Sequence, residues 1–266
     1  DNGLCRYVAI GGGAEMKEVI EVSNLSVYYE NNEAIKNISF KADQGQLIGI
    51  VGPNGAGKST LMKAVLGLEK YRGNVSILGK RVQEVRKQIS YVPQRNQIDW
   101  DFPVLVEDVV MMGRASHIAW YKRPGKRDKE IVQECLDKVG MTKFSKRQIG
   151  ELSGGQQQRV FIARSLAQQA DIFFLDEPFV GIDVTSEEII IDLLRELKRQ
   201  QKTVFVVHHD LSKVQDYFDQ LLLINKELIQ FGAVEKVYTP EILQQTYKGS
   251  LALFGTDDHK MVVTPQ

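Results

Sequence analysis

One segment limits what this chain can fold into, and it reads Gly52-Pro53-Asn54-Gly55-Ala56-Gly57-Lys58-Ser59-Thr60. It fits the pattern G-x-x-x-x-G-K-[ST], whose backbone N–H groups can cradle the phosphates of a nucleotide. The apolar run 46–51 before it has the length of a strand, and residues 61–66 after it have helical spacing. Since strand, glycine loop and helix form the context that this pattern requires, the sequence predicts a nucleotide-binding α/β core.

Length and composition narrow the class of protein. The 266 residues suffice for one large domain or two small ones, and 43% of them are hydrophobic, which is ample for a core. Lys plus Arg and Asp plus Glu both total 34, so the chain lacks the basic excess that favours nucleic-acid binding, and we expect no nucleic-acid partner. No stretch approaches the ~20 apolar residues of a membrane-spanning helix, so we expect any membrane role to run through partner subunits.

The cysteines and the N-terminal residues point to a cytoplasmic protein. Cys5 and Cys135 are too few and too far apart for a disulfide framework or a zinc site, and a reducing cytoplasm fits best. Residues 1–15 lack the basic start and long apolar centre of a secretory signal, and regular patterning begins near Met16. We therefore expect residues 1–15 to be a disordered extension.

Periodicity divides the first two thirds of the chain into a strand-rich part and a helical part. Residues 17–60 alternate apolar and polar positions, which predicts a small antiparallel sheet leading into the core. From about 95 to 165 strand patterns disappear and helical spacing dominates. The sequence thus predicts an α-helical subdomain, residues 95–165, inserted into an α/β domain that spans residues 16–232.

The strands return after the helical part. Residues 172–175 and 204–207 are continuous apolar runs, typical of parallel strands buried on both faces. Between them a helix is expected from about residue 186, with Thr185 and Glu188 as its capping box.

The end of the chain predicts a hairpin and a helix. Residues 221–224 and 228–231 should pair around a turn, and Thr239 followed by Pro240 has the form of a helix start. We expect residues 233–266 to be a C-terminal helical extension.

A second short segment, Leu152-Ser153-Gly154-Gly155-Gln156, precedes a predicted helix. Small residues with free N–H groups at a helix start suit an anion, although Ser153 would also serve as an ordinary cap. A cap requires neither the Gly-Gly-Gln that follows nor the segments 157–159 and 163–167 beyond it. Together with the glycine loop, these segments resemble the ATP-binding-cassette (ABC) family, and the resemblance covers residues 19–232.

This resemblance implies a fold and an assembly. The fold would be a P-loop NTPase (RecA-like) core with an N-terminal antiparallel β-subdomain and an inserted α-helical subdomain. The glycine loop, residues 52–60, would hold ATP, and Ser153, Gly154, Gly155 and Gln156 of a second copy would close over it. Since one chain has one of each segment, complete sites require a head-to-tail dimer that holds two ATP molecules between its copies.

Several polar residues have the chemistry that ATP hydrolysis requires. Lys58 supplies a cation to the β- and γ-phosphates, and the hydroxyl of Ser59 is suited to Mg²⁺. Asp176 and Glu177 follow the strand 172–175, where ligands gather in α/β sheets. We expect Asp176 to orient Mg²⁺ and Glu177 to act as general base on the attacking water. The alternative for this pair is a solvated acidic turn before Pro178.

Further roles follow from the family pattern. Gln94 matches the glutamine that touches Mg²⁺ and the water. His209, directly before Asp210, matches the histidine that contacts the γ-phosphate, and we expect the adjacent His208 to be a packing residue.

Two more positions match the family at the edges of the site. Tyr29 resembles the aromatic residue that stacks on adenine, and since neighbouring strand residues face opposite sides, we expect Tyr28 to pack on the sheet. Asp183 lies in the family's aspartate loop and is expected to reach across the dimer interface.

The helical part also suggests a partner. Residues 98–121 contain both tryptophans and many apolar residues, most of which we expect in the core of the subdomain. A partly exposed aromatic patch just after Gln94 would suit a helix from a membrane subunit. The basic run 122–129 is expected to be a solvated loop, with lipid headgroups as possible neighbours.

Three segments narrow the branch of the family. Residues 91–95, 99–103 and 109–114 resemble the ATPases of bacterial manganese, zinc and iron uptake systems. This branch implies integral membrane permease subunits and, indirectly, an extracytoplasmic metal-binding protein, with the ATPase peripheral at the cytoplasmic face. Manganese is the best single choice of ion, and we expect no transition-metal site in this chain.

Three rival interpretations remain. One is the ATPase of an iron–siderophore, haem or cobalamin importer, against which the Trp-Asp-Phe-Pro segment argues. The second is a non-transport ABC ATPase of translation or DNA, which would carry two cassettes or a long coiled coil where only 58 positions separate Gln94 from Leu152. A P-loop kinase is the third, and it would have no use for residues 152–156.

Overall fold

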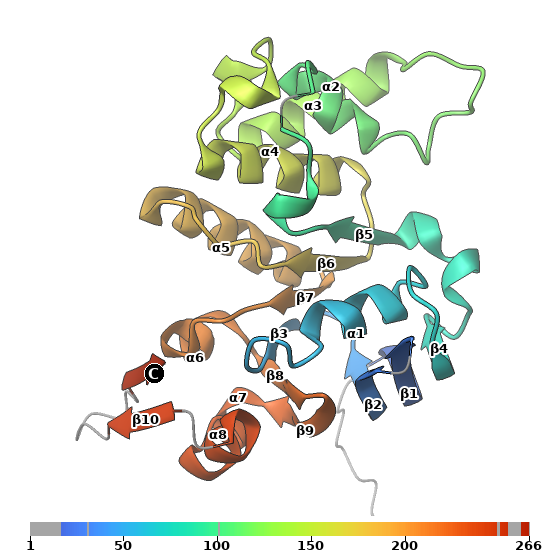
Figure 1. Ribbon diagram of the computed structural model, residues 1–266. Helices are drawn as coiled ribbons and strands as arrows, with labels where there is room; N and C mark the ends of the chain where they lie inside the picture. The colour runs from blue at the N-terminus through green and yellow to red at the C-terminus, as the bar shows by residue number, and fades with distance from the viewer. Residues whose placement is uncertain (1–16, 31, 101, 249–250, 255–261, 266) are drawn as a thin grey trace, which may run out of the picture.

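The computed structural model describes residues 17–265 apart from residues 31, 101, 249–250 and 255–261, and side chains up to residue 248. The predicted extension 1–15 therefore lies outside the described residues. Figure 1 shows an α/β body with a helical subdomain at one end of it. Within the described part of the chain, no helix combines the length and the apolar character needed to cross a bilayer.

A six-stranded sheet forms the centre of the α/β body, in the order β5-β6-β7-β3-β8-β9. Its strands are β3 (Leu47–Val51), β5 (Ile89–Val92), β6 (Ile172–Asp176), β7 (Thr203–Val207), β8 (Gln220–Asn225) and β9 (Glu227–Ala233). Pairing is parallel from β5 to β8, and β9 is antiparallel to β8. Every residue of β3, β6 and β7 is buried, as the continuous apolar runs predict for strands covered on both faces.

The predicted N-terminal antiparallel sheet is present. It has the order β2-β1-β4, formed by β1 (Glu18–Tyr29), β2 (Asn32–Asp43) and β4 (Arg72–Ile77). Helix α1 (Lys58–Val65) follows β3, and Leu61 and Met62 of this helix share one hydrophobic cluster with Ile20 of β1 and Ile48 of β3. The helix that begins at the glycine loop is thereby packed against both sheets.

Three helices build the helical subdomain, namely α2 (Val106–Met112), α3 (Lys126–Lys138) and α4 (Gly154–Ala167). A Cβ atom on Gly113 would lie 2.1 Å from the carbonyl oxygen of Arg164, so the end of α2 approaches α4 as closely as only glycine allows. Val109 of α2, Leu136 of α3 and Phe161 of α4 belong to the same cluster as Phe173 of β6. The subdomain thus shares a continuous core with the central sheet.

Helix α5 (Val184–Arg199) begins earlier than the sequence predicts. Asp183 is its N-cap and accepts a hydrogen bond from the backbone N–H of Ser186 at 2.8 Å. The expected capping box of Thr185 and Glu188 is therefore wrong, because both residues already lie inside the helix. Aspartate caps a helix at least as well as threonine, so the earlier start prevails.

The C-terminal part has a mixed structure. The hairpin of β8 and β9 is confirmed, and α7 (Val234–Val237) precedes α8 (Pro240–Tyr247), which Thr239 caps as expected. Beyond α8, β10 (Leu251–Phe254) and β11 (Val262–Pro265) form a two-stranded antiparallel sheet. A wholly helical extension is thus wrong, because apolar runs of this length do not distinguish strand from helix by periodicity. Helix α6 (Val214–Tyr217) completes the set of α-helices among the described residues.

Candidate active site

A cleft of about 400 Å³ surrounds the glycine loop, at the carboxyl ends of β3, β5 and β6. Its lining combines the loop, two predicted catalytic residues, the start of β2 and the β8–β9 turn: Asn32, Glu33, Ala34, Asn54, Gly55, Ala56, Gly57, Lys58, Ser59, Thr60, Gln94, Glu177 and Lys226. Loop and strand ends meet here because parallel strands all end on one edge of the sheet.

Two glycines allow the loop to pack tightly against its surroundings. Gly57 has φ 92°, in the left-handed region, and a Cβ atom there would lie 2.2 Å from Cγ2 of Ile35. A Cβ atom on Gly52 would lie 2.0 Å from the carbonyl oxygen of Ile224. Any other residue at either position would push the loop away from β2 or β8.

The ammonium group of Lys58 lies inside the loop. Its Nζ donates hydrogen bonds to the carbonyl oxygens of Gly52 at 2.7 Å and Pro53 at 3.0 Å, and the residue is only 6% exposed. Burial lowers the pKa of this amine. The loop therefore holds a desolvated cation at the N-terminus of α1, an arrangement that favours phosphate.

Ser59, Asp176 and Gln94 converge on one point of the cleft. The hydroxyl of Ser59 donates to Oδ1 of Asp176 at 3.0 Å, and Nε2 of Gln94 donates to Oγ of Ser59 at 3.4 Å. Asp176 is fully buried, its Oδ2 has no hydrogen-bond partner, and burial raises the pKa of its carboxyl group. Oxygen ligands of this kind, with a buried carboxylate oxygen left unpaired, fit Mg²⁺.

Glu177 follows directly and has an unusual backbone. Its φ is 52°, in the left-handed region, which is uncommon for a residue other than glycine and costs free energy. The half-buried side chain lines the nucleotide cleft and also a neighbouring cavity of about 440 Å³ that Gln94 and Trp100 share. A strained backbone that directs a carboxylate into the cleft is consistent with a catalytic role.

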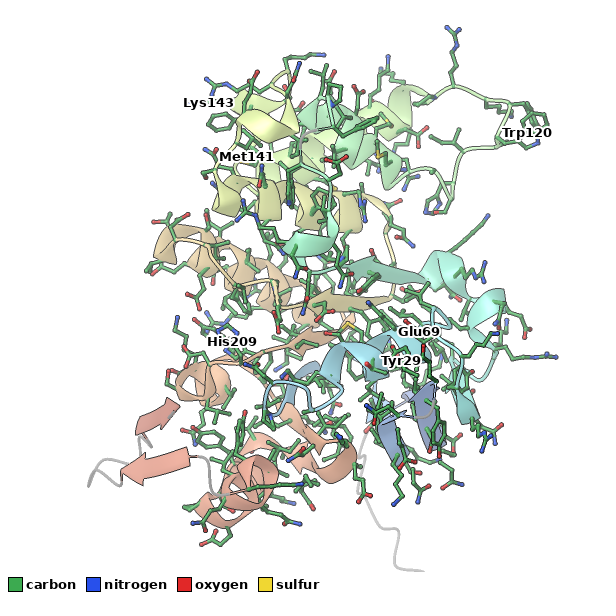
Figure 2. The ribbon with its side chains drawn as sticks, in the orientation of Figure 1. Tyr29, Glu69, Trp120, Met141, Lys143 and His209 are labelled. Carbon is green, nitrogen blue, oxygen red and sulfur yellow. The ribbon has the colours of Figure 1, made fainter. Side chains whose placement is uncertain are left out.

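The doubled histidine at the end of β7 separates into two environments. His208 is 2% exposed, and its ring makes an edge contact with Phe179 at 5.4 Å between centroids, so it is the packing residue that the sequence predicts. Its Nε2 has no partner, and burial lowers its pKa to about 4. His209 is exposed (Figure 2), but it is not among the residues that line the cleft.

Tyr28 and Tyr29 do not alternate as expected. Each is 44% exposed, so the assignment of Tyr28 to sheet packing is wrong. The pairing of β1 with β2 has an irregularity between Val27 and Tyr28, which breaks the two-residue alternation. The hydroxyl of Tyr28 donates to Glu33 at 2.7 Å.

The second predicted segment forms the start of α4. The backbone N–H of Ser153 donates to Oε1 of Gln156 at 2.9 Å, and the N–H of Gln156 donates to Oγ of Ser153 at 3.4 Å. Ser153 is therefore a helix cap within its own chain. Neither Ser153, Gly154, Gly155 nor Gln156 lines the cleft around the glycine loop.

This segment packs closely against the start of α5. A Cβ atom on Gly155 would lie 2.5 Å from Oδ2 of Asp183 and 2.5 Å from Oγ of Ser186. Both carboxylate oxygens of Asp183 accept hydrogen bonds from Ser186, at 2.8 Å each, and the bond from its backbone N–H lowers the pKa of Asp183. Asp183 is thus engaged within its own chain, and its reach to a second copy stays a prediction.

The sequence analysis missed four residues of the cleft and one hydrogen bond between Arg95 and α4. Asn32, Glu33 and Ala34 come from the start of β2, and Lys226 comes from the β8–β9 turn, where its N–H donates to the carbonyl oxygen of Ala56 at 2.9 Å. No local motif marks these residues, because long-range strand pairing brings them to the loop. Arg95 was missed as well, although it directly follows Gln94, and its guanidinium donates to Gln157 of α4 at 2.9 Å.

Known proteins are similar to this chain in sequence and in fold. The family model described as ABC transporter matches residues 35–180, more than half of the chain. The chain is 68% identical over 248 residues to the manganese transport system ATP-binding protein MntB of Halalkalibacterium halodurans, covering 93% of this chain and 99% of that protein. It is 53% identical to the MntB of Bacillus subtilis, covering 87% and 93%, and 46% identical to the zinc transport system ATP-binding protein TroB of Treponema pallidum, covering 88% of each.

Solved structures agree on the fold. The chain is similar to cbiO1 of Clostridium perfringens, part of the ABC transporter complex cbiONQ, with TM-score 0.72 and 26% identity over 86% of this chain and 94% of that one. A nucleotide-free ATP-binding cassette from an ABC transporter matches with TM-score 0.75, covering 85% of this chain and 98% of that one, and at 24% identity supports the fold alone. The predicted P-loop NTPase fold is confirmed.

Proposed function

The chain belongs to the ABC transporter family and is an ATP-binding ATPase, and we propose that it powers manganese import through a partner permease. Relatives named for manganese transport cover almost the whole chain at high identity. A relative named for zinc transport is more distant, at 46% identity, which makes zinc the second candidate ion. The subunit would act at the cytoplasmic side of the membrane, beside its permease.

The convergence of Ser59, Asp176, Gln94 and Glu177 on the glycine-loop cleft supports the ATP-hydrolysing part of this function. Lys58 and the loop N–H groups would bind the phosphates, and the Ser59 hydroxyl, the Asp176 carboxylate and the Gln94 amide would hold Mg²⁺. Bound Mg²⁺ would neutralise charge on the phosphate oxygens. Glu177 would accept a proton from the attacking water, and His209 would reach the γ-phosphate.

Two copies would share each ATP. Ser153, Gly154, Gly155 and Gln156 lie outside the cleft of their own chain, so they are free to cover the nucleotide of a partner copy. The close contact between Gly155 and Asp183 supports this, because it places residues 152–156, the signature segment, against the loop that holds Asp183. ATP binding would draw the copies together, and hydrolysis would release them.

Transport in a reconstituted system tests the ion and the partner. The chain is co-expressed with a candidate metal permease from the same genome, and the purified complex is placed in vesicles with the candidate extracytoplasmic binding protein. We expect ATP-dependent uptake of manganese that exceeds uptake of zinc, and no uptake with Glu177→Gln. Preferred uptake of zinc would identify zinc rather than manganese as the transported ion. Failure of the chain to co-purify with any permease would contradict the transport role.

A further inference from the structure

The loop between α2 and α3, residues 113–125, is held at both of its ends by an ion pair and hydrogen bonds. Nε of Arg114 lies 3.0 Å from Oδ1 of Asp128, and the two side chains are 7% and 17% exposed. The same guanidinium donates to the carbonyl oxygen of Ala167 at 2.8 Å, and Oδ2 of Asp128 accepts from the N–H of Gly125 at 2.9 Å. Charge-assisted hydrogen bonds of this kind fix the geometry of the loop base.

The tip of this loop exposes two large aromatic side chains. Trp120 is 95% exposed and Tyr121 is 70% exposed, and their rings contact each other edge-on at 5.7 Å between centroids. Figure 2 shows Trp120 at the end of the loop, projecting away from the helices. An anchored loop that presents aromatic rings to solvent points to a binding surface, because such side chains are normally covered.

Basic residues follow the aromatic tip in the chain, and they are exposed: Lys122, Arg123, Lys126 and Arg127. The sequence has no aspartate or glutamate between Asp108 and Asp128. The acidic groups near this cluster belong to α2 and α3. Glu107 and Asp108 of α2 line a cavity together with Arg123, and on α3 Arg127 lies 3.4 Å from Glu130 and 3.7 Å from Glu134, while Lys126 lies 4.0 Å from Glu130. These exposed pairs are weak, so the surface keeps a positive potential.

We propose that the tip of the α2–α3 loop binds directly to the anionic headgroups of a phospholipid bilayer. Tryptophan and tyrosine favour the membrane–water interface, and each lysine or arginine close to an anionic surface adds attraction. A protein-binding surface fits less well, since the centres of protein interfaces are depleted in lysine. This inference rests on the proposed location at the membrane, and it adds a lipid contact that does not pass through the permease.

Vesicles without any permease test this contact. The full chain is sedimented with vesicles of equal parts phosphatidylglycerol and phosphatidylcholine, and with vesicles of phosphatidylcholine alone. We expect binding to the anionic vesicles that weakens as salt is raised, because the attraction is screened. Replacing Lys122 and Lys126 by Gln should weaken it about fivefold for each lysine removed.

Tryptophan emission reports on the tip itself. The chain has two tryptophans, and Trp100 is half-buried with its ring 5.0 Å from that of Phe161, so a shift on binding should come from Trp120. We expect a blue shift with anionic vesicles and quenching by brominated lipid. Trp120→Phe should abolish both signals, and a double variant with Trp120→Ala and Tyr121→Ala should lose most of the binding.

Matched variants control for exposed aromatic area and for charge. Phe102→Ala removes another exposed ring (58% exposed), and Lys143→Glu changes a charge on the other side of the subdomain in Figure 2. Both controls should bind vesicles like the wild type, and all loop variants should keep the wild-type ATPase rate. Unchanged vesicle binding by the double variant would overturn the proposal. If that variant instead fails to co-purify with the permease, the loop is a protein contact.

The proposed function and the proposed lipid contact can be contradicted independently of each other. Absence of ATP-driven metal uptake, with vesicle binding through Trp120 intact, would contradict the proposed function and leave the lipid contact in place. Normal uptake with no binding to anionic vesicles would contradict the lipid contact alone.

Discussion

The hydroxyl of Ser59 donates a 3.0 Å hydrogen bond to Asp176, although 117 positions separate the two residues in the chain. Ser59 lies in the first turn of α1 and Asp176 ends β6, so their contact exists only once the parallel sheet has formed. The second carboxylate oxygen of Asp176 is buried without a partner. The fold therefore gathers oxygen ligands that fit Mg²⁺ at the expense of its own stability.

Asp176→Asn should stabilise the nucleotide-free protein and abolish its ATPase activity. Because burial raises the pKa of this carboxyl group above its unfolded value, ionised Asp176 destabilises the fold at every pH above the unfolded pKa. We expect a gain of about 1–2 kcal/mol, or a few degrees in Tm, measured without nucleotide or Mg²⁺. A lower Tm for the variant would show that the buried carboxylate is not strained.

Protonation of His208 should lower the free energy of unfolding in mild acid. Burial lowers its folded-state pKa to about 4 from an ordinary 6.5, so the unfolded chain binds more protons between those values and stability falls as pH drops through that window. Linkage gives a loss of about 2 kcal/mol at pH 5 from this residue. His208→Phe should remove that part of the pH dependence, measured as the free energy of unfolding by urea at pH 7 and at pH 5. An equal loss of this free energy between the two pH values in both proteins would contradict the assignment.

Substitutions of Tyr29 and of its neighbour Tyr28 form a matched test and control for adenine binding. Tyr28 is engaged by Glu33 and lies under the guanidinium of Arg72, 5.2 Å from the ring centroid, whereas Tyr29 pairs in the sheet with Asn32 of the cleft. If Tyr29 stacks on adenine, Tyr29→Ala should raise the Kd for ATP about tenfold or more, since stacking on an aromatic side chain contributes ~1–3 kcal/mol. Tyr28→Ala should change it little, and the reverse ranking, measured by titration calorimetry, would transfer the role to Tyr28.

Sequence patterns predicted the nucleotide core well, because its parts are local. The glycine loop, the buried strands β3, β6 and β7 and the cap of Thr239 each depend on neighbours in the chain. The predicted start of α5 was wrong by about two residues, because Asp183 and Thr185 are both acceptable caps and aspartate is the stronger of the two.

The rest of the site depends on long-range contacts that no pattern marks. Lys226 reaches the cleft through the β8–β9 turn, and the irregular pairing beside Tyr28 breaks the alternation on which the tyrosine prediction relied. The family resemblance supplied the roles of Gln94 and His209, and the structure places only Gln94 in the cleft of its own chain.

Mixing two inactive variants tests most directly whether each ATP site is shared between copies. Lys58→Ala disables the glycine loop, and Ser153→Arg places a bulky cation at an exposed position of the signature segment. In a head-to-tail dimer of the two, one site combines both defects and the other is intact, so the mixture should recover up to about a quarter of the wild-type ATPase rate. Wild-type hydrolysis by Ser153→Arg alone, or no recovery on mixing, would contradict the shared site.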